Sequence, residues 1–328
     1  MSGAHPTRVA AYGTGLLRTE IHALPAPGAG PVAAPGAGFH WSRVPGPLAP
    51  VGFQPLADEL VAQLGELTGS AATRLVLGQV RGTAREYRVG GAESLAARLL
   101  RTGPDAEAAR ALRELGALLA RLHGLRPPAV VPAGPPAGLR RLADWLAAAP
   151  TGGHAAPLGP VAEGTGAPRA GLLLRERLGE RRLGRLRRWC AAAAADGQRA
   201  VLVHGAPSLG AAVLGPGGSV ELLTGEDLCR APWYLDLGWL TGELVELAWQ
   251  QGGDHRRWQS LLTALTAGYG ADLGDRWHRA AALRTALHLH DFSAYVAWDP
   301  AVALRYAAFL GFLIDQRPTL VRASGEES

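Results

Sequence analysis

The sequence contains no lysine, because all 33 basic residues among its 328 residues are arginines. A lysine amine forms Schiff bases with carbonyl substrates, and a lowered pKa makes it a general base in other enzymes. Arginine supplies neither activity, since its guanidinium stays protonated in proteins. Mechanisms that require a side-chain amine are therefore excluded.

Cysteine is also scarce, since the chain has only Cys190 and Cys229. Two cysteines make no disulfide framework and lack the spacing of a metal site, so we expect neither, in keeping with a reduced cytosolic setting. The N-terminus has no apolar stretch of signal length, and no apolar run approaches the ~18 residues of a membrane span. We therefore expect a cytoplasmic protein that has no membrane partner.

The composition is that of a folded globular protein, with 48% hydrophobic and 19% charged residues. The formal net charge is +5, but the arginines are spread through helix-like segments. This pattern indicates a solvated basic surface, and we expect no nucleic-acid partner. The arginine-rich stretch at residues 175–189 is one surface where charge reversal should weaken binding to a protein or peptide.

Strand patterns occupy the first part of the chain. Residues 8–22 predict two strands joined by a glycine turn, and residues 25–50, rich in proline, glycine and alanine, predict a long loop. The leucine spacing in residues 55–67 predicts a helix, and residues 73–83 predict a strand that closes in a glycine turn.

The remainder of the chain is mainly helical in pattern. Residues 105–125 begin with an aspartate and end before two prolines, and residues 235–320 are almost all helical in pattern. Short strands are expected within residues 201–224. We therefore predict an α+β fold of two lobes, a small β-containing N-terminal lobe at residues 1–83 and a larger, mainly helical C-terminal lobe at residues 84–328.

One stretch, VLVHGAPSLGAAVL at residues 201–214, resembles the catalytic loop of aminoglycoside phosphotransferases and choline kinases. These proteins share the two-lobed protein-kinase fold and typically have His-Gly-Asp, four further residues and Asn. His204 and Gly205 match this pattern. Ala206 stands where the family has the aspartate that accepts the substrate proton, and Ala211 stands where it has a metal-binding asparagine.

The resemblance extends to residues on both sides of this degenerate loop, residues 203–211. The family's second metal-binding aspartate is expected about 18 residues after the first and about 12 before a downstream Asp-Leu pair, and both counts give Thr224. The resemblance implies that Asp236, from that pair, holds the loop backbone and that His204 braces it. It also implies that His123 ends a helix beside the loop and that residues 74–83 form the hinge strand.

Phosphoryl transfer depends on positioning and on neutralising the charge of the phosphates. With no lysine, and with alanine or threonine at the positions of the base and both metal ligands, we expect neither family-type phosphotransferase activity nor a cofactor. Arg8, Arg18 and Arg43 are the candidates for contacting a phosphate. A guanidinium does not replace the oxygen ligands that Mg²⁺ requires.

Two acidic residues follow the degenerate position directly. Glu226 and Asp227, with Arg230, are the candidates for residual ligand binding, because a small shift of register brings a carboxylate toward the expected metal position. The alternative interpretation is a solvated acidic turn.

A second cluster lies near the end of the chain, where His288, His290 and Asp291 fall within four positions of a predicted helix. His288 and Asp291 are one turn apart, so a carboxylate on the same face can orient an imidazole that moves protons near neutral pH. His204 is a further candidate for such chemistry. A pair of ordinary surface histidines is the alternative.

These observations favour a kinase-fold protein that binds a peptide or a partner enzyme without phosphorylating it. The resemblance includes proteins of specialised-metabolite pathways, among them ribosomal-peptide pathways of the lanthipeptide type. Two alternatives stay open. One is an enzyme with replaced chemistry, a lyase or a thioether-forming cyclase that uses the histidine cluster, and the other is an atypical phosphotransferase.

Overall fold

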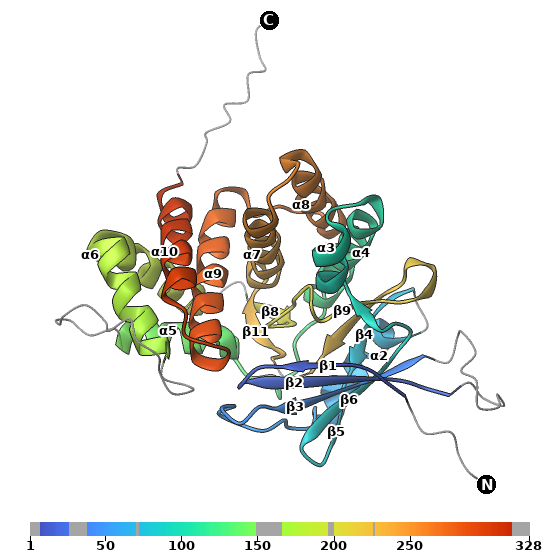
Figure 1. Ribbon diagram of the computed structural model, residues 1–328. Coiled ribbons are helices and arrows are strands. Elements are labelled where there is room, and N and C mark those ends of the chain that lie inside the picture. Colours follow the sequence, from blue (N-terminus) through green and yellow to red (C-terminus); the bar gives the residue numbers. More distant parts are fainter. Residues whose placement is uncertain are drawn as a thin grey trace, which may run out of the picture.

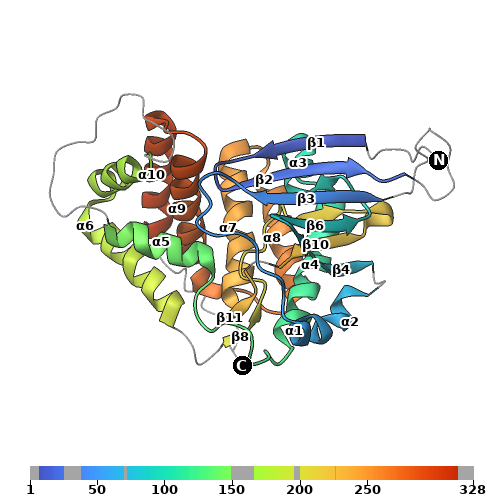
Figure 2. The ribbon, with the colours of Figure 1, turned by 90° about the horizontal axis from the view of Figure 1, so that it is seen from below.

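The computed structural model of the protein describes residues 7–25, 38–69, 72–148, 166–195, 200–225 and 227–316. Figures 1 and 2 show β-sheets gathered on one side of the molecule and a layered group of helices on the other. The small β-containing and larger helical parts of the predicted α+β fold are therefore both present.

Within the described residues, the N-terminal sheet has five strands in the order β1-β2-β3-β6-β5, each antiparallel to its neighbour. In β2 the side chains of Thr19 and Ile21 are buried, whereas Arg18 and Glu20 are exposed. This period of two is that of a strand with one face against a core. The strands span Thr7–Gly13 (β1), Leu17–Ala23 (β2), Phe39–Pro45 (β3), Gln79–Arg81 (β5) and Ala84–Val89 (β6).

The expectation of one long loop over residues 25–50 is wrong, because β3 lies inside that range at the centre of the sheet. The proline and glycine signal comes mainly from residues 25–38, most of which lie outside the described residues. The segment Phe39-His40-Trp41-Ser42-Arg43 has few turn-forming residues, and Trp41 is almost completely buried. Because the prediction used the composition of residues 25–50 as a whole, it missed the seven-residue strand β3.

The predicted lobe boundary after residue 83 falls within a hairpin. Gly82, with a φ of 59°, forms the turn of the β5–β6 hairpin, so residue 83 lies inside a hairpin of the N-terminal sheet. The chain leaves this sheet only after Val89, where β6 ends. Residues 74–83, which the resemblance predicts to be one hinge strand, instead belong to β4, β5 and the hairpin turn before β6.

Two smaller sheets pair strands from distant regions of the chain. The described strands of the first have the order β4-β10-β9-β7, and β10 pairs in parallel with β4. The β9–β10 hairpin thus pairs side by side with a strand from the N-terminal region. The strands span Thr73–Leu77 (β4), Glu93–Ser94 (β7), Ala212–Leu214 (β9) and Val220–Thr224 (β10), and Ala200–Val203 (β8) pairs with Cys229–Pro232 (β11).

Most of the chain beyond β7 is helical, as the periodicity predicted. The carboxylate of Asp105 caps α4 by accepting a hydrogen bond from the Ala108 amide at 2.7 Å. The helix expected over residues 55–67 is divided at Leu64 into two short helices. The helices span Asp58–Gln63 (α1), Gly65–Thr68 (α2), Leu95–Thr102 (α3), Ala106–His123 (α4), Ala137–Ala148 (α5), Gly166–Ala195 (α6), Tyr234–Gln251 (α7), His255–Tyr269 (α8), Trp277–Tyr295 (α9) and Pro300–Asp315 (α10).

The buried side chains form two clusters. One lies between the sheets and α4, α7 and α8, and the other lies among α5, α6, α9 and α10. Trp239 and Leu235 of α7 belong to the second cluster and Leu237 and Leu240 to the first, so α7 contributes to both. Among the described residues, no helix combines the length and the hydropathy needed to cross a membrane.

The segment between β6 and β7 is held from both sides. The Trp41 indole N–H donates to the Gly91 carbonyl at 3.0 Å, and the Gly90 amide donates to a carboxylate oxygen of Glu221 at 2.5 Å. A Cβ atom at Gly91 would lie 1.8 Å from the Leu214 carbonyl oxygen, so only glycine fits this approach. These contacts fix the N-terminal sheet relative to the β9–β10 hairpin.

We expect Trp41→Ala to lower the free energy of unfolding by about 3–5 kcal/mol, because it removes a large buried ring and orphans the Gly91 carbonyl. Denaturant unfolding at equilibrium measures the change. Trp277→Ala is the matched control, since Trp277 is 38% exposed and should lose less than about 1.5 kcal/mol. A loss at Trp41 no larger than the control's would contradict the central packing role of this side chain.

Candidate functional site

A cavity of about 380 Å³ separates the inner face of the N-terminal sheet from the helices. Its roof includes the turn between β1 and β2 and the side chain of Arg43 from β3. Its floor is the loop between β8 and β9, and its far wall is the side of α9 that carries Arg284, His288 and Asp291. We call this cavity the cleft.

The floor of the cleft is held by the carboxylate of Asp236, which is completely buried in the first turn of α7. It accepts hydrogen bonds from the backbone amides of His204 at 2.7 Å and Gly205 at 2.9 Å, and from Nε2 of His123 at 3.0 Å. Nε2 of His204 donates to the Leu223 carbonyl at 3.0 Å. The structure therefore brings Asp236, His204 and His123 together beneath the loop.

The three positions expected to hold the base and the metal ligands carry no carboxylate or amide side chain. Ala206 and Ala211 both line the cleft. Thr224 is fully buried, and its hydroxyl donates to the Leu222 carbonyl at 2.9 Å. Mg²⁺ requires several oxygen ligands, so this set of side chains does not fit a magnesium ion.

A positive charge, the guanidinium of Arg85, lies beside Gly225, which follows Thr224 in the chain. A Cβ atom at Gly225 would lie 2.3 Å from Nη1 of Arg85, so the guanidinium fills the space that a side chain would take. Arg85 is 1% exposed and donates to the carbonyls of Gly78 at 3.2 Å and Gln54 at 2.7 Å. A fixed guanidinium here repels a cation, which agrees with the absence of metal ligands. Sequence analysis missed Arg85, because β6 places it on the buried face with Tyr87 and Val89, where a charged side chain is not expected.

Arg43 is the arginine that faces the cleft. Strand register places it on one cross-strand row with Thr19 of β2 and Arg85 of β6, and such residues share a face of the sheet. Its guanidinium lies 5.6 Å from the centre of the Tyr87 ring. Among the described side chains, no carboxylate forms an ion pair with it. Arg43 is therefore available to an anionic group of a ligand.

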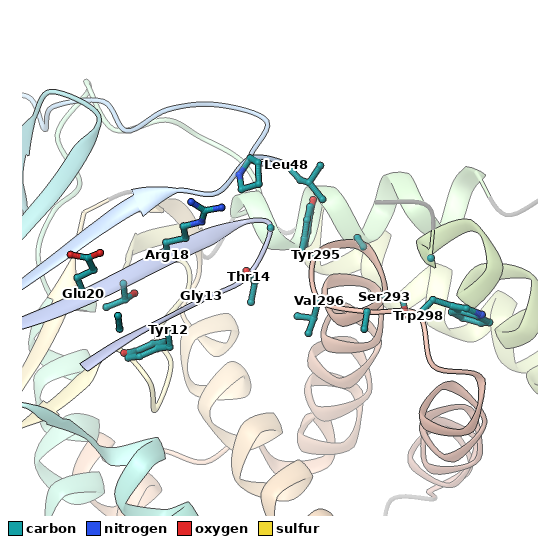
Figure 3. A pocket seen from close by; sticks show the side chains of 17 residues that line it. Tyr12, Gly13, Thr14, Arg18, Glu20, Leu48, Ser293, Tyr295, Val296 and Trp298 are labelled. Carbon is teal, nitrogen blue, oxygen red and sulfur yellow. The ribbon is translucent and has the colours of Figure 1, made fainter. Parts of the chain in front are cut away.

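The other two arginine candidates lie elsewhere. Arg18 is on the exposed face of β2 and lines a second cavity of about 750 Å³, which adjoins the cleft at Thr14, Tyr295 and Val296. Arg8 lines neither cavity. Figure 3 shows this second cavity between the β1–β2 hairpin and the end of α9, with Tyr12, Tyr295 and Trp298 in its walls. The Gly15 amide donates to the Tyr295 carbonyl at 2.6 Å, so the hairpin turn bridges the two sides of the molecule.

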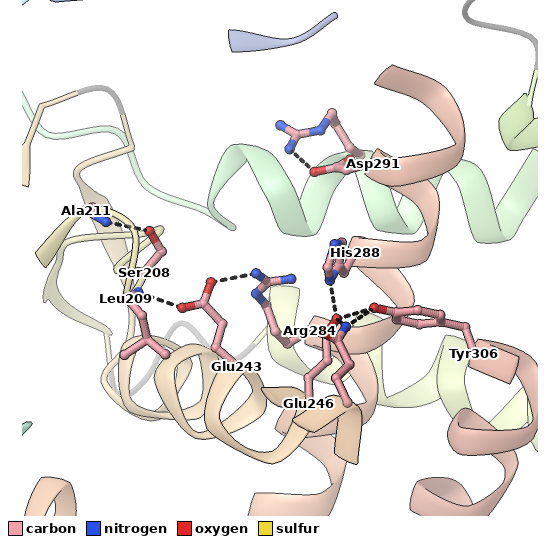
Figure 4. Close-up of polar contacts among 11 residues, drawn as sticks. Ser208, Leu209, Ala211, Glu243, Glu246, Arg284, His288, Asp291 and Tyr306 are labelled. Atoms are coloured by element: carbon pink, nitrogen blue, oxygen red, sulfur yellow. Dashed lines mark hydrogen bonds and ion pairs between the residues drawn. The ribbon is translucent and has the colours of Figure 1, made fainter. Parts of the chain in front are cut away.

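The wall of the cleft carries a histidine with a buried carboxylate behind it. Nδ1 of His288 is hydrogen-bonded to Glu246 of α7, and Tyr306 of α10 donates to the same carboxylate oxygen at 2.5 Å (Figure 4). Burial would raise the pKa of Glu246, but its hydrogen bond and attraction to His288, helped by the charge of Arg284, keep that pKa below its ordinary value. Nε2 of His288 has no hydrogen-bond partner among the described residues. This imidazole is therefore oriented, and it lines the cleft.

The partner of His288 differs from the sequence expectation. Asp291, one turn away, instead accepts a hydrogen bond from Arg141 of α5 at 2.9 Å and contacts Nδ1 of His290 at 2.7 Å. His290 is buried beside Trp145, 5.3 Å between ring centres, and does not line the cleft. The histidine cluster is thus two separate pairs, and Glu246, 42 positions from His288, was missed.

A second buried carboxylate, Glu243, supports the floor of the cleft. It accepts a hydrogen bond from the Leu209 amide at 2.6 Å and forms an ion pair with Arg284 at 2.5 Å (Figure 4). The negative charge of Glu243 raises the pKa of Arg284 against the effect of burial, so the arginine stays charged. The loop, α7 and α9 are therefore connected through charged side chains.

Of the three candidates for residual ligand binding, the structure describes Asp227 and Arg230. Glu226 lies outside the described residues. Asp227 lines the cleft, and its negative charge contributes to the raised pKa of Arg141. Arg230 lies on β11, where its amide donates to the Pro132 carbonyl at 2.8 Å, and it does not line the cleft. Within the ranges that the structure describes, no three His, Cys, Asp or Glu side chains are placed to hold a metal ion.

Comparison with solved structures identifies the fold. The chain aligns over 94% of its length with 92% of a spectinomycin phosphotransferase in complex with ADP and spectinomycin, at a TM-score of 0.53 and 11% identity. It aligns over 95% of its length with 82% of a Plasmodium vivax ethanolamine kinase, at a TM-score of 0.50 and 9% identity. No protein-family model and no curated protein sequence matches the chain. At these identities the likeness shows the fold alone, and it confirms the predicted aminoglycoside phosphotransferase and choline kinase-like fold.

The lowered pKa of Glu246 makes the stability of the protein depend on pH. Because its folded-state pKa lies below the ordinary value of 4.5, Glu246 stabilises the fold above that pH, and the contribution is lost as pH falls below it. We expect Glu246→Gln to lower the free energy of unfolding by about 1–3 kcal/mol at pH 7 and to flatten its fall between pH 5 and pH 3.

Thermal unfolding across this pH range measures the effect. Glu59→Gln, at an exposed position of α1, is the matched control and should follow the parent protein. An unchanged acid profile in Glu246→Gln would show that the His288–Glu246 contact does not stabilise the fold.

Proposed function

We propose that the protein is a kinase-fold binding protein that holds a peptide, or a segment of a partner enzyme, in the cleft without phosphorylating it. One observation carries the proposal. The cleft keeps a charged lining, with Arg43 available to an anion, while Ala206, Ala211 and Thr224 offer no ligand to a metal. A site with this lining selects charged groups but cannot neutralise a triphosphate in the way that kinases do.

The size of the cleft supports a ligand smaller than a folded domain. About 380 Å³ accommodates a few side chains of a peptide or a small metabolite. Arg43, on the roof, attracts a carboxylate, whereas Asp227 and Asp291 place carboxylates in the same lining. By resemblance to kinase-fold proteins of ribosomal-peptide and other specialised-metabolite pathways, we favour a peptide that another enzyme of the pathway modifies.

The first test measures nucleotide binding. We expect calorimetric titration with Mg-ATP to give no saturable heat at millimolar concentrations, because the sequence has no lysine, the side chains of Ala206, Ala211 and Thr224 provide no metal ligand, and Arg85 lies beside Gly225. Titration with ADP and AMP without Mg²⁺ separates recognition of the base from recognition of the metal. A dissociation constant in the micromolar range would overturn the proposal and favour an atypical phosphotransferase.

A second candidate function is an enzyme with replaced chemistry, and the His288–Glu246 pair favours it. An imidazole held by a buried carboxylate and facing a cavity has the geometry of a general base. A lyase or a thioether-forming cyclase needs such a base to remove a proton and an acid to return it. His204 is less suited to this role, since its ring is buried and donates to a backbone carbonyl.

Substitution of His288 separates binding from catalysis. If the cleft only binds, His288→Ala should leave ligand affinity and pathway output within about twofold, as should His290→Ala. If His288 is a general base, its alanine variant should lower turnover by about 100-fold or more while affinity persists. Arg43→Gln should instead weaken binding of an anionic ligand, and Arg8→Gln is its control outside the cleft.

The comparison requires variants of matched thermal stability, since Glu246 loses its partner when His288 is removed. Candidate ligands come from a pull-down with the parent protein in its native host. A turnover loss in His288→Ala at unchanged affinity would replace the binding proposal with the enzymatic one.

A further inference from the structure

Figures 1 and 2 show α6 and α10 in the helical part, on the side away from the N-terminal sheet. The side chains of these helices, with α9, line a groove. Two adjoining cavities, of about 630 and 540 Å³, form it and share Asp315 and Gln316. Arg279 of this groove and His288 of the cleft are nine positions apart on α9, about 14 Å along the helix axis. The groove is therefore distinct from the cleft.

One half of the groove, which we call the apolar half, is lined by small and aliphatic side chains of α10 and by Arg177, Leu178 and Arg182 of α6. Leu304, Ala307, Ala308 and Gly311 form its base. Phe312 stands at its edge with 60% of its surface exposed, the largest value for an aromatic residue among the described exposed hydrophobic side chains. An exposed aromatic ring beside a cavity is a typical anchor for a protein partner.

The other half, which we call the cationic half, gathers arginines from α6 and α9. Arg181, Arg185 and Arg188 lie on one face of α6, because they are spaced by four and three residues, and Arg279 joins them from α9. The carboxylate of Asp315 is already engaged by Arg182, whose Nε donates to it at 2.9 Å, and by Arg185 at 3.7 Å.

Among the described side chains, no carboxylate forms an ion pair with Arg181, Arg188 or Arg279. The ring of Trp189 lies 5.8 Å from the Arg279 guanidinium and gives this half an aromatic surface. Like charges held close together repel one another in the free protein, and an anionic partner relieves that repulsion.

We propose that this groove docks an acidic, amphipathic segment of a partner protein. The apolar side chains of that segment pack against Phe312 and α10, and its carboxylates pair with Arg181, Arg188 and Arg279. A protein segment fits better than a nucleic acid, because the cationic surface is a compact cavity joined to an aliphatic one and not a continuous track for phosphates. The proposal goes beyond the function of the cleft and stands independently of it.

The experiment uses a fluorescent 12-residue probe with leucine at helical spacing and glutamate elsewhere, and a counterpart with glutamine in place of glutamate. Anisotropy with the full-length protein should show binding of the glutamate probe that is at least about tenfold tighter than that of the glutamine probe. Raising the salt from about 50 to 300 mM should weaken it by about tenfold.

Variants identify the surface. The double variant Arg181→Gln with Arg188→Gln should weaken probe binding by about tenfold or more, and Phe312→Ser should also weaken it. The matched control is Arg256→Gln with Arg257→Gln, which removes the same charge from exposed positions of α8 and should bind as the parent does. The thermal midpoint of the Arg181/Arg188 variant should not fall, because removing like charges relieves repulsion.

Four outcomes would overturn the proposal. These are equal affinity for the two probes, stronger competition by a single-stranded RNA oligomer than by unlabelled peptide, and a dimer in sedimentation that the Arg181/Arg188 variant converts to monomer. The fourth is a tenfold gain in probe affinity when residues 317–328 are deleted, since the chain itself would then be the occupant. Arg43→Gln should leave probe binding unchanged, so failure of the cleft proposal and failure of this one are distinguishable.

Discussion

The carboxylate of Asp236 is the constraint on which the rest of the site depends. It is completely buried at the start of α7 and accepts hydrogen bonds from the His204 and Gly205 amides and from His123 at the end of α4. A buried carboxylate that loses its donors costs several kcal/mol, so these three segments are held in one arrangement. The loop therefore keeps its shape although Ala206 and Ala211 give it no reactive group. A scaffold of this kind is as useful for binding as for catalysis.

Charge near the cleft is distributed differently from what a metal–nucleotide complex requires. Arg85 places a guanidinium against Gly225, and Arg43 presents a second one on the same face of the sheet. Both favour anions over cations, whereas the carboxylates of Glu243, Glu246 and Asp291 are engaged by Arg284, His288 and Arg141. Most charged side chains that line the cleft therefore have a partner of opposite charge. Arg43 has no carboxylate partner among the described side chains.

The cleft and the α6–α10 groove are suited to two different kinds of ligand. The cleft is small and lined by both signs of charge, which favours a ligand with a specific arrangement of polar groups. The groove combines apolar and cationic surface around Phe312 and Arg188, which favours a protein segment. Because α9 contributes to both, a protein that binds the groove would lie close to whatever the cleft holds.

Local sequence patterns were enough to predict the helices of the C-terminal part and the position of the degenerate loop, but not β3 or β6. Helices such as α4 could be predicted from the periodic spacing of their apolar residues and from the Asp105 cap. The matches at His204, Gly205 and Asp236 could be predicted from their spacing along the chain. Tertiary structure alone decided that β3 is central, that β6 completes the N-terminal sheet, that Arg85 is buried and that Glu246 is the partner of His288. The reason is physical: periodicity reports which face of one segment is apolar, whereas burial of a charge and choice of its partner depend on segments that meet only after the chain has folded.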